Sequence, residues 1–439
     1  MKRTLLLAST LAMFGMSYKT VQLPIQGPVQ TTSSATPSQG VTVSPPVSVS
    51  PITVSPITTA KIIQPKFDGV FDDATAVQSI INYDIQHNIF EYDMPPAPAG
   101  KCYHFKSKIS IIGTPFFTFY WNATALPWNS IQVEHDGVAV ESMGMKYCTF
   151  SGIRMILMQS NSIGFDNSGD INHQSDSNST YRGCRVQMYW GDDHTPATKN
   201  CTGFRVGNTG NDHSFIVYDR CDVFGDSTGS PADIPGSIQR AHAAGHRAFE
   251  MLGGNTCAMR FMNDTMTGVD VGISTGGRPG ELTASGGNNF RAIGCGGSFN
   301  NCCYVIDAGY SASMWGDEWE ECGGYALIGS PFQSGRGIGR ISISDIEFRA
   351  GHAENNDKLG YLDKGSFINV NSNSNVAIAN FGGYGEVYNQ STWIGIRSNL
   401  NPGPTITVAG SFFTDVTKVP FARIPLSNVI TPIEQYTAQ

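Results

Sequence analysis

Six cysteines recur along the chain at nearly constant intervals, and this feature restricts the possible fold most strongly. The intervals are 36, 37, 36, 38 and 27 residues, between Cys148, Cys184, Cys221, Cys257, Cys295 and Cys322. Fixed periods of roughly 20–50 residues are typical of solenoids, in which each repeat packs on its neighbours. The spacing therefore predicts a stack of coils with one of these cysteines in each.

The sequence around the cysteines has the alternation of short, half-buried strands. Apolar residues follow two or four positions later, and aromatic or apolar residues stand three positions earlier, at Met145, Tyr181, Tyr218 and Trp319. This pattern predicts that the cysteines point inward in one column, about 4.8 Å apart. None belongs to a C-x-x-C pair, so we expect buried thiols and no metal, with disulfides between coils as the alternative that distance permits.

The composition argues against several classes of partner. Only 15% of the 439 residues are charged, the formal net charge is −8, and the sequence contains no run of Lys and Arg. This balance argues against nucleic acid as a partner. No segment approaches the roughly 20 apolar residues that cross a bilayer, so we expect no membrane span.

The N-terminal part has two segments of unusual composition. In residues 1–17, Met1-Lys2-Arg3 precedes an apolar stretch, which predicts a secretory signal or an apolar segment that anchors the chain in a larger assembly. Residues 18–62 are rich in Ser, Thr, Pro and Val, with a loose V-S-P repeat. Such a segment favours extended conformations, so we expect a linker or stalk.

The stretch FDGVFDDATAVQSI, residues 67–80, places three aspartates in one turn before an apolar stripe. Asp72 or Asp73 is suited to cap a helix N-terminus. Val77, Ile81 and Ile85 lie on one face of that helix, and a short strand follows it. The aspartates are therefore interpreted as capping residues, in a helix that covers the first open coil.

The pattern D-G-x-x-D-D-x-x-A-x-Q, from Asp68 to Gln78, and the helix, strand and turn after it resemble the N-terminal cap of the pectate-lyase superfamily. That superfamily of right-handed parallel β-helices includes phage tailspike proteins. The resemblance implies an all-β, single-stranded right-handed parallel β-helix (solenoid) with a short N-terminal capping helix. It implies a cap at 63–113, a β-helix with long loops at 114–425 and a tail at 426–439. The proline-rich turn at 95–100 is longer than is usual in the family.

Four polar stretches, rich in glycine and serine, interrupt the strand-like sequence. They are residues 167–180, 190–200, 225–247 and 274–289. Insertions in a solenoid usually gather on one face and build the binding surface there. We therefore expect a groove over the middle coils, with Trp190, Asp193 and His194 among its substrate-binding residues.

The segment SMWGDEWEEC, residues 313–322, is the densest acidic and aromatic stretch of the chain. If Trp319 points inward, Glu318 and Glu320 both face outward, about 6.6–6.8 Å apart at Cα. Glycoside hydrolysis uses carboxyl pairs at roughly 5–9.5 Å. Glu318 and Glu320 are therefore the catalytic candidates, with Asp317 close enough to assist them and Trp315 offering a flat face for a sugar ring.

A structural explanation of the same acidic residues stays open. The position two residues before the cysteines holds Lys146, Arg182, Asp219 and Glu320, and an exposed column of mixed charge serves solubility alone. A lyase would instead need a cation that stabilises an enolate and a base near it. Among the arginines in strand-like sequence, Arg291 is included as a substrate-binding candidate. His242 and His246 are four residues apart but have no Glu between them, so we expect structural or exposed histidines.

Three functions are compatible with these features. The first is recognition and probable depolymerisation of a cell-surface polysaccharide (a capsule, a lipopolysaccharide or another glycan) by a tailspike-like β-helix, which the resemblance makes a homotrimer on a virion surface. The second is a secreted, monomeric polysaccharide lyase or glycoside hydrolase. The third is a non-catalytic structural or glycan-binding β-helix. None of the three calls for a cofactor.

Overall fold

The computed structural model describes most of the chain from residue 62 onward. The described residues are 62–112, 119–123, 130–144, 147–167, 178–189, 197–207, 212–225, 237–252, 255–276, 289–306, 311–329, 339–351, 366–372, 374–384, 394–397, 405–414 and 421–422. They all belong to one compact unit, Thr58–Gln439. The predicted signal at 1–17, the stalk at 18–62 except its last residue, and the tail at 426–439 lie outside them.

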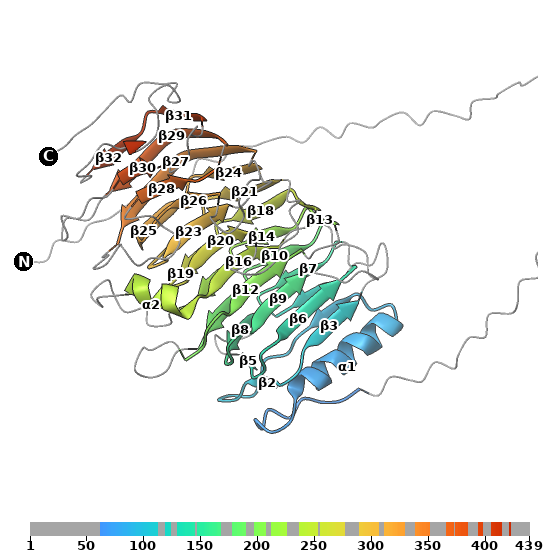
Figure 1. The fold of residues 1–439 in the computed structure, drawn as a ribbon. Coiled ribbons are helices and arrows are strands. Elements are labelled where there is room, and N and C mark those ends of the chain that lie inside the picture. Colours follow the sequence, from blue (N-terminus) through green and yellow to red (C-terminus); the bar gives the residue numbers. More distant parts are fainter. Residues whose placement is uncertain are drawn as a thin grey trace, which may run out of the picture. The chain divides into compact units, whose positions relative to one another are not determined.

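The described chain winds into coils, each of which adds a strand to parallel ladders that run through the stack (Figure 1). Two ladders belong to one 20-stranded sheet and meet at a corner, and the third is an 11-stranded sheet. Every pairing between successive coils is parallel. The predicted all-β parallel solenoid is therefore confirmed, and α1 (Asp73–Gln86) lies across its first coil as the capping helix.

The elements follow the same order in each coil. The first ladder contains β1 (Glu91–Asp93), β4 (Tyr120–Asn122), β7 (Thr149–Ser151), β10 (Thr180–Arg182), β14 (Val217–Asp219), β18 (Met259–Met262), β21 (Asn289–Ile293), β24 (Ser311–Trp315), β27 (Arg340–Ala350), β29 (Asn375–Tyr384) and β31 (Thr405–Ala409). The second contains β2 (Tyr103–Phe105), β5 (Ile131–Val133), β8 (Arg154–Leu157), β11 (Arg185–Met188), β15 (Asp222–Phe224), β19 (Thr265–Thr267), β22 (Gly296–Ser298), β25 (Glu318–Cys322), the later parts of β27 and β29, and β32 (Phe412–Thr414).

The third ladder lies in the separate sheet. It contains β3 (Ile109–Ile112), β6 (Val138–Met143), β9 (Ile163–Asn167), β12 (Thr202–Val206), β16 (Arg247–Met251), β20 (Val271–Thr275), β23 (Cys302–Ile306), β26 (Ala326–Ile328), β28 (Ser366–Val370), β30 (Ile394–Arg397) and β33 (Phe421–Ala422). A small extra sheet pairs β13 (Asp212–Ser214) with β17 (Asn255–Cys257). A second helix, α2 (Ser237–Ala244), lies within the predicted loop 225–247, so that part of the loop prediction was wrong.

A left-handed residue makes the corner between the first two ladders. In nine successive coils one residue there has a φ between 51° and 70°: Gly152, Gly183, Arg220, Asn263, Gly294, Gly316, Asp345, Asn380 and Gly410. In β27 and β29 this residue lies inside the strand, which is why those two strands extend into both ladders. Glycine adopts this conformation without a steric penalty, and Asn and Asp tolerate it better than most residues.

The residues that directly follow the corner in each coil lie above one another in a single column. The composition of this column shows that the prediction of one column of cysteines was wrong. The column contains Ile153, Cys184, Cys221, Asp264, Cys295, Asp317, Ile346, Phe381 and Ser411. Only Cys184 and Cys221 are direct neighbours, and Cys148, Cys257 and Cys322 occupy other positions. The coils differ in length, from 22 residues between Cys295 and Asp317 to 43 between Cys221 and Asp264, so equal intervals do not give equal positions. The cysteines are free thiols and mostly buried, as expected.

The polar members of this column satisfy the backbone of the preceding coil. Asp264 Oδ1 accepts the Cys221 N–H at 2.7 Å, and Asp317 Oδ1 accepts the Cys295 N–H at 3.1 Å. At the same position, Ser411 Oγ accepts the N–H of Phe381 at 3.1 Å. A buried N–H without a partner is costly. A polar residue is therefore buried at this position because its oxygen accepts a hydrogen bond from a backbone N–H of the preceding coil.

Two stacks of aromatic rings fill the core of the middle coils. In the first ladder Tyr218 stacks on Tyr181 at 5.2 Å and on Phe261 at 5.2 Å, and Phe204 stacks on Phe249 at 5.0 Å in the third ladder. Rings of the two stacks meet edge to face, as Tyr218 and Phe249 do at 62°. Buried side chains between Ala74 and Val408 form one continuous hydrophobic core in the described part of the stack. Aromatic pairs of this kind add about 0.5–1.5 kcal/mol each beyond their burial.

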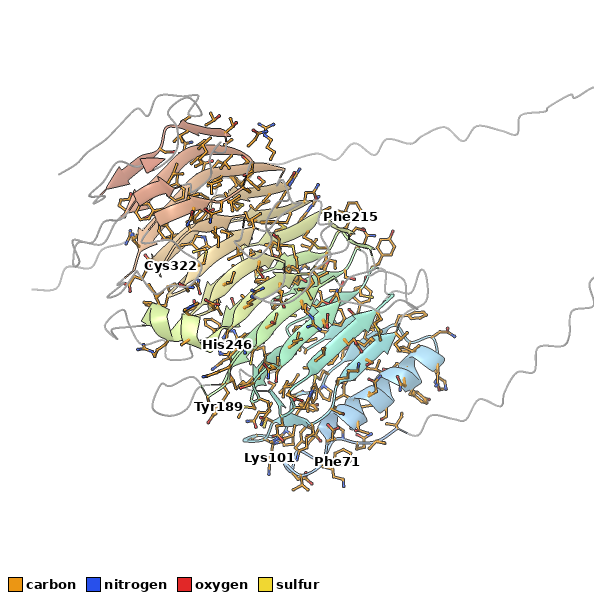
Figure 2. The ribbon with its side chains drawn as sticks, viewed as in Figure 1. Phe71, Lys101, Tyr189, Phe215, His246 and Cys322 are labelled. Atoms are coloured by element: carbon orange, nitrogen blue, oxygen red, sulfur yellow. The ribbon has the colours of Figure 1, made fainter. Side chains whose placement is uncertain are left out.

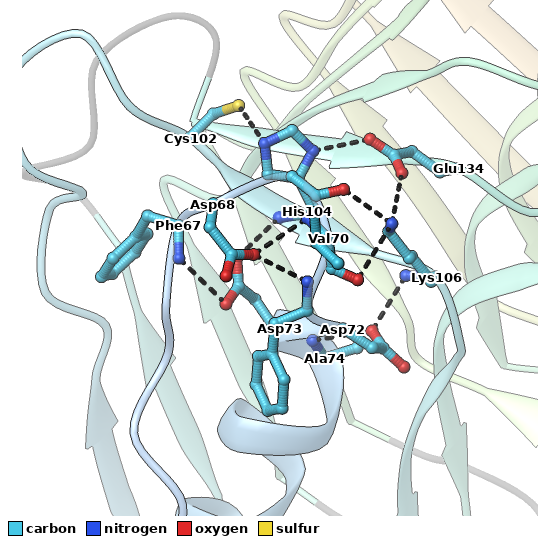
Figure 3. Close-up of polar contacts among 12 residues, drawn as sticks. Phe67, Asp68, Val70, Asp72, Asp73, Ala74, Cys102, His104, Lys106 and Glu134 are labelled. Carbon is cyan, nitrogen blue, oxygen red and sulfur yellow. Dashed lines mark hydrogen bonds and ion pairs between the residues drawn. The ribbon is translucent and has the colours of Figure 1, made fainter.

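The three aspartates of the cap bind backbone N–H groups at the open edge of the first coil (Figure 3). Asp73 Oδ1 accepts the N–H of Lys66 at 2.8 Å, and its Oδ2 accepts the N–H of His104 at 3.0 Å. Asp72 caps α1 through the N–H of Ala74 and also accepts the Lys106 N–H at 2.9 Å. Asp68 forms a local turn, with Val70 as one donor.

Gln78 binds the backbone of the next strand, β3, in the same way. Its side-chain oxygen accepts the N–H of Ser110 at 2.6 Å, and its Nε2 donates to the carbonyl of Ser110 at 3.0 Å. The strands β2 and β3 have a ladder partner on one side only, in β5 and β6. Asp72, Asp73 and Gln78 therefore replace the missing coil before the first one.

Candidate functional site

The strand β25 presents two glutamates to solvent. Along it Glu318 and Glu320 are exposed, Trp319 and Cys322 are buried, and the ladder is irregular between Trp319 and Cys322. The bend falls at Glu321, whose φ is 51°. The expected outward orientation of Glu318 and Glu320, with Trp319 inward, is confirmed.

The next coil adds a third carboxylate and an arginine that the sequence analysis did not identify. Glu347 of β27 is the ladder partner of Glu318, about 4.8 Å away at Cα by the usual strand spacing. Arg349 Nη2 lies 2.9 Å from Glu347 Oε1, and Arg349 Nη1 lies 3.5 Å from Glu320 Oε1. The hydrogen bond to Glu347 raises the pKa of Arg349, burial lowers it, and the charges of the three glutamates raise it further. The position of β27 in register with β25, rather than any motif, brings these residues together.

Trp315 is the exposed aromatic residue of this surface. The residue is 52% exposed, and its indole Nε1–H donates to Asp345 Oδ2 at 2.7 Å. Asp345 Oδ1 in turn accepts from Asn380 Nδ2 at 3.0 Å, so neighbouring coils fix the orientation of the indole. A ring held in this way offers an apolar face to a flat partner without losing much conformational entropy.

Arg291 lies on the same outward surface. It is exposed on β21, and its neighbour two residues along, Ile293, is the ladder partner of Trp315. Arg260 is in register with Arg291 in the preceding coil and is also exposed. We use the name β24–β25 face for the exposed side chains on both sides of the corner at Gly316, which are Arg291 and Trp315 of the first ladder and Glu318, Glu320, Glu347 and Arg349 of the second.

Asp317 does not belong to the β24–β25 face, contrary to its predicted role beside the glutamates. It is 2% exposed and points into the core, where its Oδ2 accepts hydrogen bonds from Tyr304 at 2.5 Å and Tyr325 at 3.3 Å. Burial raises the pKa of Asp317 to about 7, although these hydrogen bonds lower it. The physical reason is strand alternation: Asp317 stands two residues before the buried Trp319 and so points inward with it, whereas the prediction relied on closeness in the sequence alone.

The remaining candidates lie elsewhere or outside the described residues. Trp190, Asp193 and His194 fall in a segment that the structure does not describe, as do most of the four predicted loops and the groove expected over them. Arg182 and Asp219, two members of the predicted column of mixed charge, are neighbours and form an ion pair at 3.2 Å, but Glu320 belongs to the other ladder.

The two histidines near α2 both have hydrogen-bond partners. His242 Nδ1 lies 2.8 Å from Asp270 Oδ1, and that hydrogen bond raises the pKa of His242. His246 is buried and its Nδ1 accepts the N–H of Cys201. Among the residues that the structure describes, no group of three or more His, Cys, Asp and Glu is arranged to hold a metal ion, and no helix is long and apolar enough to cross a membrane.

Comparison with solved structures identifies similar folds. The tailspike protein of E. coli bacteriophage HK620, in complex with pentasaccharide, matches with a TM-score of 0.51 at 13% sequence identity, over 82% of this chain and 61% of that chain. Another structure of that tailspike with pentasaccharide gives 0.50 at 12% identity, over 82% and 61%. The catalytic domain of a GH87 α-1,3-glucanase in complex with nigerose gives 0.41 at 11% identity, over 87% and 71%.

The two tailspike matches support the architecture seen in the structure. The chain has the right-handed parallel β-helix fold of the phage tailspike proteins, as the N-terminal motif predicted. It spans about three fifths of the length of the tailspike structures that it matches. No family model matches the sequence, and no curated protein does.

Proposed function

We propose that the chain binds a cell-surface polysaccharide along the β24–β25 face and hydrolyses it with Glu318 and Glu320. The observation that carries this proposal is the outward pair of carboxylates next to a half-exposed, oriented indole. Trp315 would stack on a sugar ring, and Arg291 would bind hydroxyl or acidic groups of a neighbouring sugar. A fold shared with a tailspike that is known with a bound pentasaccharide is compatible with this use of the surface.

Arg349 lies close to both glutamates. Its Nη1 lies 3.5 Å from Glu320 Oε1, and the charge of Glu318 contributes to the raised pKa of Arg349. Glu318 is also in register with the carboxylate Glu347 of the next coil. Hydrolysis needs one carboxyl as the acid that protonates the leaving oxygen and another as base or nucleophile, and we assign these two roles to the pair.

A glycan-binding protein without catalysis is the second candidate. It is favoured by the ion pairs that Arg349 makes with Glu320 and Glu347, because such charge ladders also occur where no reaction takes place. In this case Trp315 and Arg291 would contribute to binding, and the glutamates would not be needed for any change in the polysaccharide.

The two functions are distinguished by glutamine substitutions. Capsule and lipopolysaccharide preparations are screened for chain shortening by size-exclusion chromatography, with Glu91→Gln, an exposed glutamate of the first coil, as the matched control. We expect Glu318→Gln and Glu320→Gln each to reduce the rate about 10²–10⁴-fold while binding persists. Shortening that survives both changes would exclude this site. Binding without shortening by the unmodified protein would establish the second function.

We further propose that the working form is a homotrimeric spike on a virion, with residues 18–62 as the stalk. Sedimentation equilibrium tests the trimer, and intact mass tests the N-terminus. A monomer that lacks residues 1–17 would instead support the secreted enzyme.

A further inference from the structure

Three side chains beside the capping helix lie in the order thiol, imidazole and carboxylate (Figure 3). Cys102 Sγ lies 3.4 Å from His104 Nε2, and His104 Nδ1 lies 2.6 Å from Glu134 Oε1. Because the Nδ1–H donates to the carboxylate, Nε2 carries the lone pair that faces the thiol. Lys106 Nζ lies 3.7 Å from the other oxygen of Glu134. The order is that of a nucleophile, its general base and a group that orients the base.

We propose that Cys102, His104 and Glu134 form a second active site, which cleaves small acyl esters through a thioester on Cys102. The proposal does not depend on the function of the β24–β25 face, because the two sites share no residue. The triad lies on the first two coils, with Cys102 immediately before β2 and Glu134 immediately after β5.

The surroundings of the thiol leave room for an acyl group. Cys102 is partly exposed and stands two residues after the proline-rich turn at 95–100, and the residue between them, Lys101, lies at the α1 end of the stack (Figure 2). A Cβ atom added to Gly100 would meet no atom within 4 Å, so the side of the turn is open. A Cβ atom added to Gly69 would lie 3.6 Å from the imidazole of His104, so a larger residue there would occupy space beside Nε2 that glycine leaves free.

The backbone provides a donor for the developing negative charge. The N–H of Cys102 makes no hydrogen bond with any residue that the structure describes, whereas the next residue, Tyr103, donates to the Ser130 carbonyl at 2.8 Å. A free N–H on the nucleophile itself is a donor of the kind that stabilises the oxyanion in acyl transfer.

The chemistry follows from the state of the thiol. Burial, with smaller contributions from the charges of Glu134 and Asp73, raises the pKa of the Cys102 thiol, so the sulfur keeps its proton until attack. During attack, the C–S bond forms, His104 Nε2 takes the thiol proton, the ester C–O bond breaks and the alcohol leaves with that proton. Water, deprotonated by His104, then attacks the thioester, which releases the acid and regenerates the thiol.

The test uses the full chain and p-nitrophenyl acetate. We expect a burst of one equivalent of p-nitrophenol and a mass increase of one acetyl group, located on Cys102 by peptide mapping. Cys102→Ala should abolish the burst, and His104→Gln should slow it about 10²–10⁴-fold. Cys257→Ala is the control, because Cys257 is the other partly exposed thiol among the described cysteines.

Glu134 is a positioning residue, so its test includes conservative rescue. We expect Glu134→Gln to slow acylation at least tenfold and Glu134→Asp to restore part of the rate. Glu141→Gln, which removes the ion pair with Lys108 on the neighbouring strand, should have no effect. The proposal fails if no burst occurs in the unmodified protein, if Cys257 is acetylated as fast as Cys102, or if His104→Gln, folded by its melting curve, keeps the full rate.

Discussion

Replacement of Asp73 by alanine should destabilise the protein more than any other change in the cap motif. Asp73 is fully buried, and its carboxylate accepts hydrogen bonds from the N–H groups of Lys66 at 2.8 Å, Phe67 at 3.3 Å and His104 at 3.0 Å. Each N–H that loses its partner costs about 1–3 kcal/mol when buried, and less where water reaches it. Because the Lys66 and Phe67 groups are only partly buried, we expect a total loss of about 3 kcal/mol.

The assay is urea unfolding followed by circular dichroism, with Asp68→Ala as the matched control. Asp68 also accepts two hydrogen bonds, from the N–H groups of Val70 and Phe71. These groups lie on the exposed side of the turn, where water can accept their hydrogen bonds when the carboxylate is removed. Amide hydrogen exchange adds a local measurement, because the His104 N–H should lose protection in Asp73→Ala alone. Equal midpoints for the two variants would refute the idea that Asp73 acts by closing the edge of the first coil.

Three further predictions concern the core. Asp317 has a folded-state pKa of about 7 against 3.8 for the free side chain, so the folded state binds the proton more tightly and its stability falls as pH rises between these values. The unmodified protein should lose unfolding free energy between pH 5 and pH 8, and in Asp317→Asn this loss should be about 2 kcal/mol smaller. The same loss in both proteins would contradict the raised pKa of Asp317. Gly203→Ala should lower the free energy of unfolding by about 1–3 kcal/mol, because the new Cβ would lie 2.8 Å from the Ala248 carbonyl oxygen. Gly183→Asn is the control and should lower it by less than about 1 kcal/mol, because an added Cβ at this corner meets no atom. Tyr218→Ala, which removes a ring stacked on both sides, should cost about 3–5 kcal/mol in the same denaturation assay, and a loss below about 1 kcal/mol would contradict a tightly packed ring stack.

The sequence was sufficient to predict the fold, the cap and the outward face of β25. Each depends on local chemistry: the helix cap at Asp72, the capping motif up to Gln78, and strand alternation around Trp319. Asp317 was misplaced because its role was inferred from closeness in the sequence, although alternation from Trp319 already places it inward. The left-handed corner at Gly316 instead changes the alternation for Trp315, which is exposed, and this positive φ leaves no mark in the sequence beyond a common glycine. A pattern of period two is therefore reliable only within one strand.

Register between coils was the part that sequence spacing did not predict. The cysteine intervals were nearly equal, yet Cys148 aligns with Ser179 and not with Cys184. Phe150, two residues after Cys148, stacks on Tyr181, which stands three residues before Cys184. Glu347 and Arg349 were missed for the same reason, since their proximity to the glutamates depends on how β27 pairs with β25. The triad at Cys102 was overlooked because Glu134 comes from the following coil.

The closed end of the first coil has a consequence for association between molecules. A bare terminal coil would expose a row of main-chain donors and acceptors, to which a second molecule could add its own strands. Asp72, Asp73 and Gln78 occupy those groups, so the α1 end of one molecule is no template for edge-to-edge polymerisation. Loss of these side chains should therefore promote filament growth from that end as well as lower the free energy of unfolding.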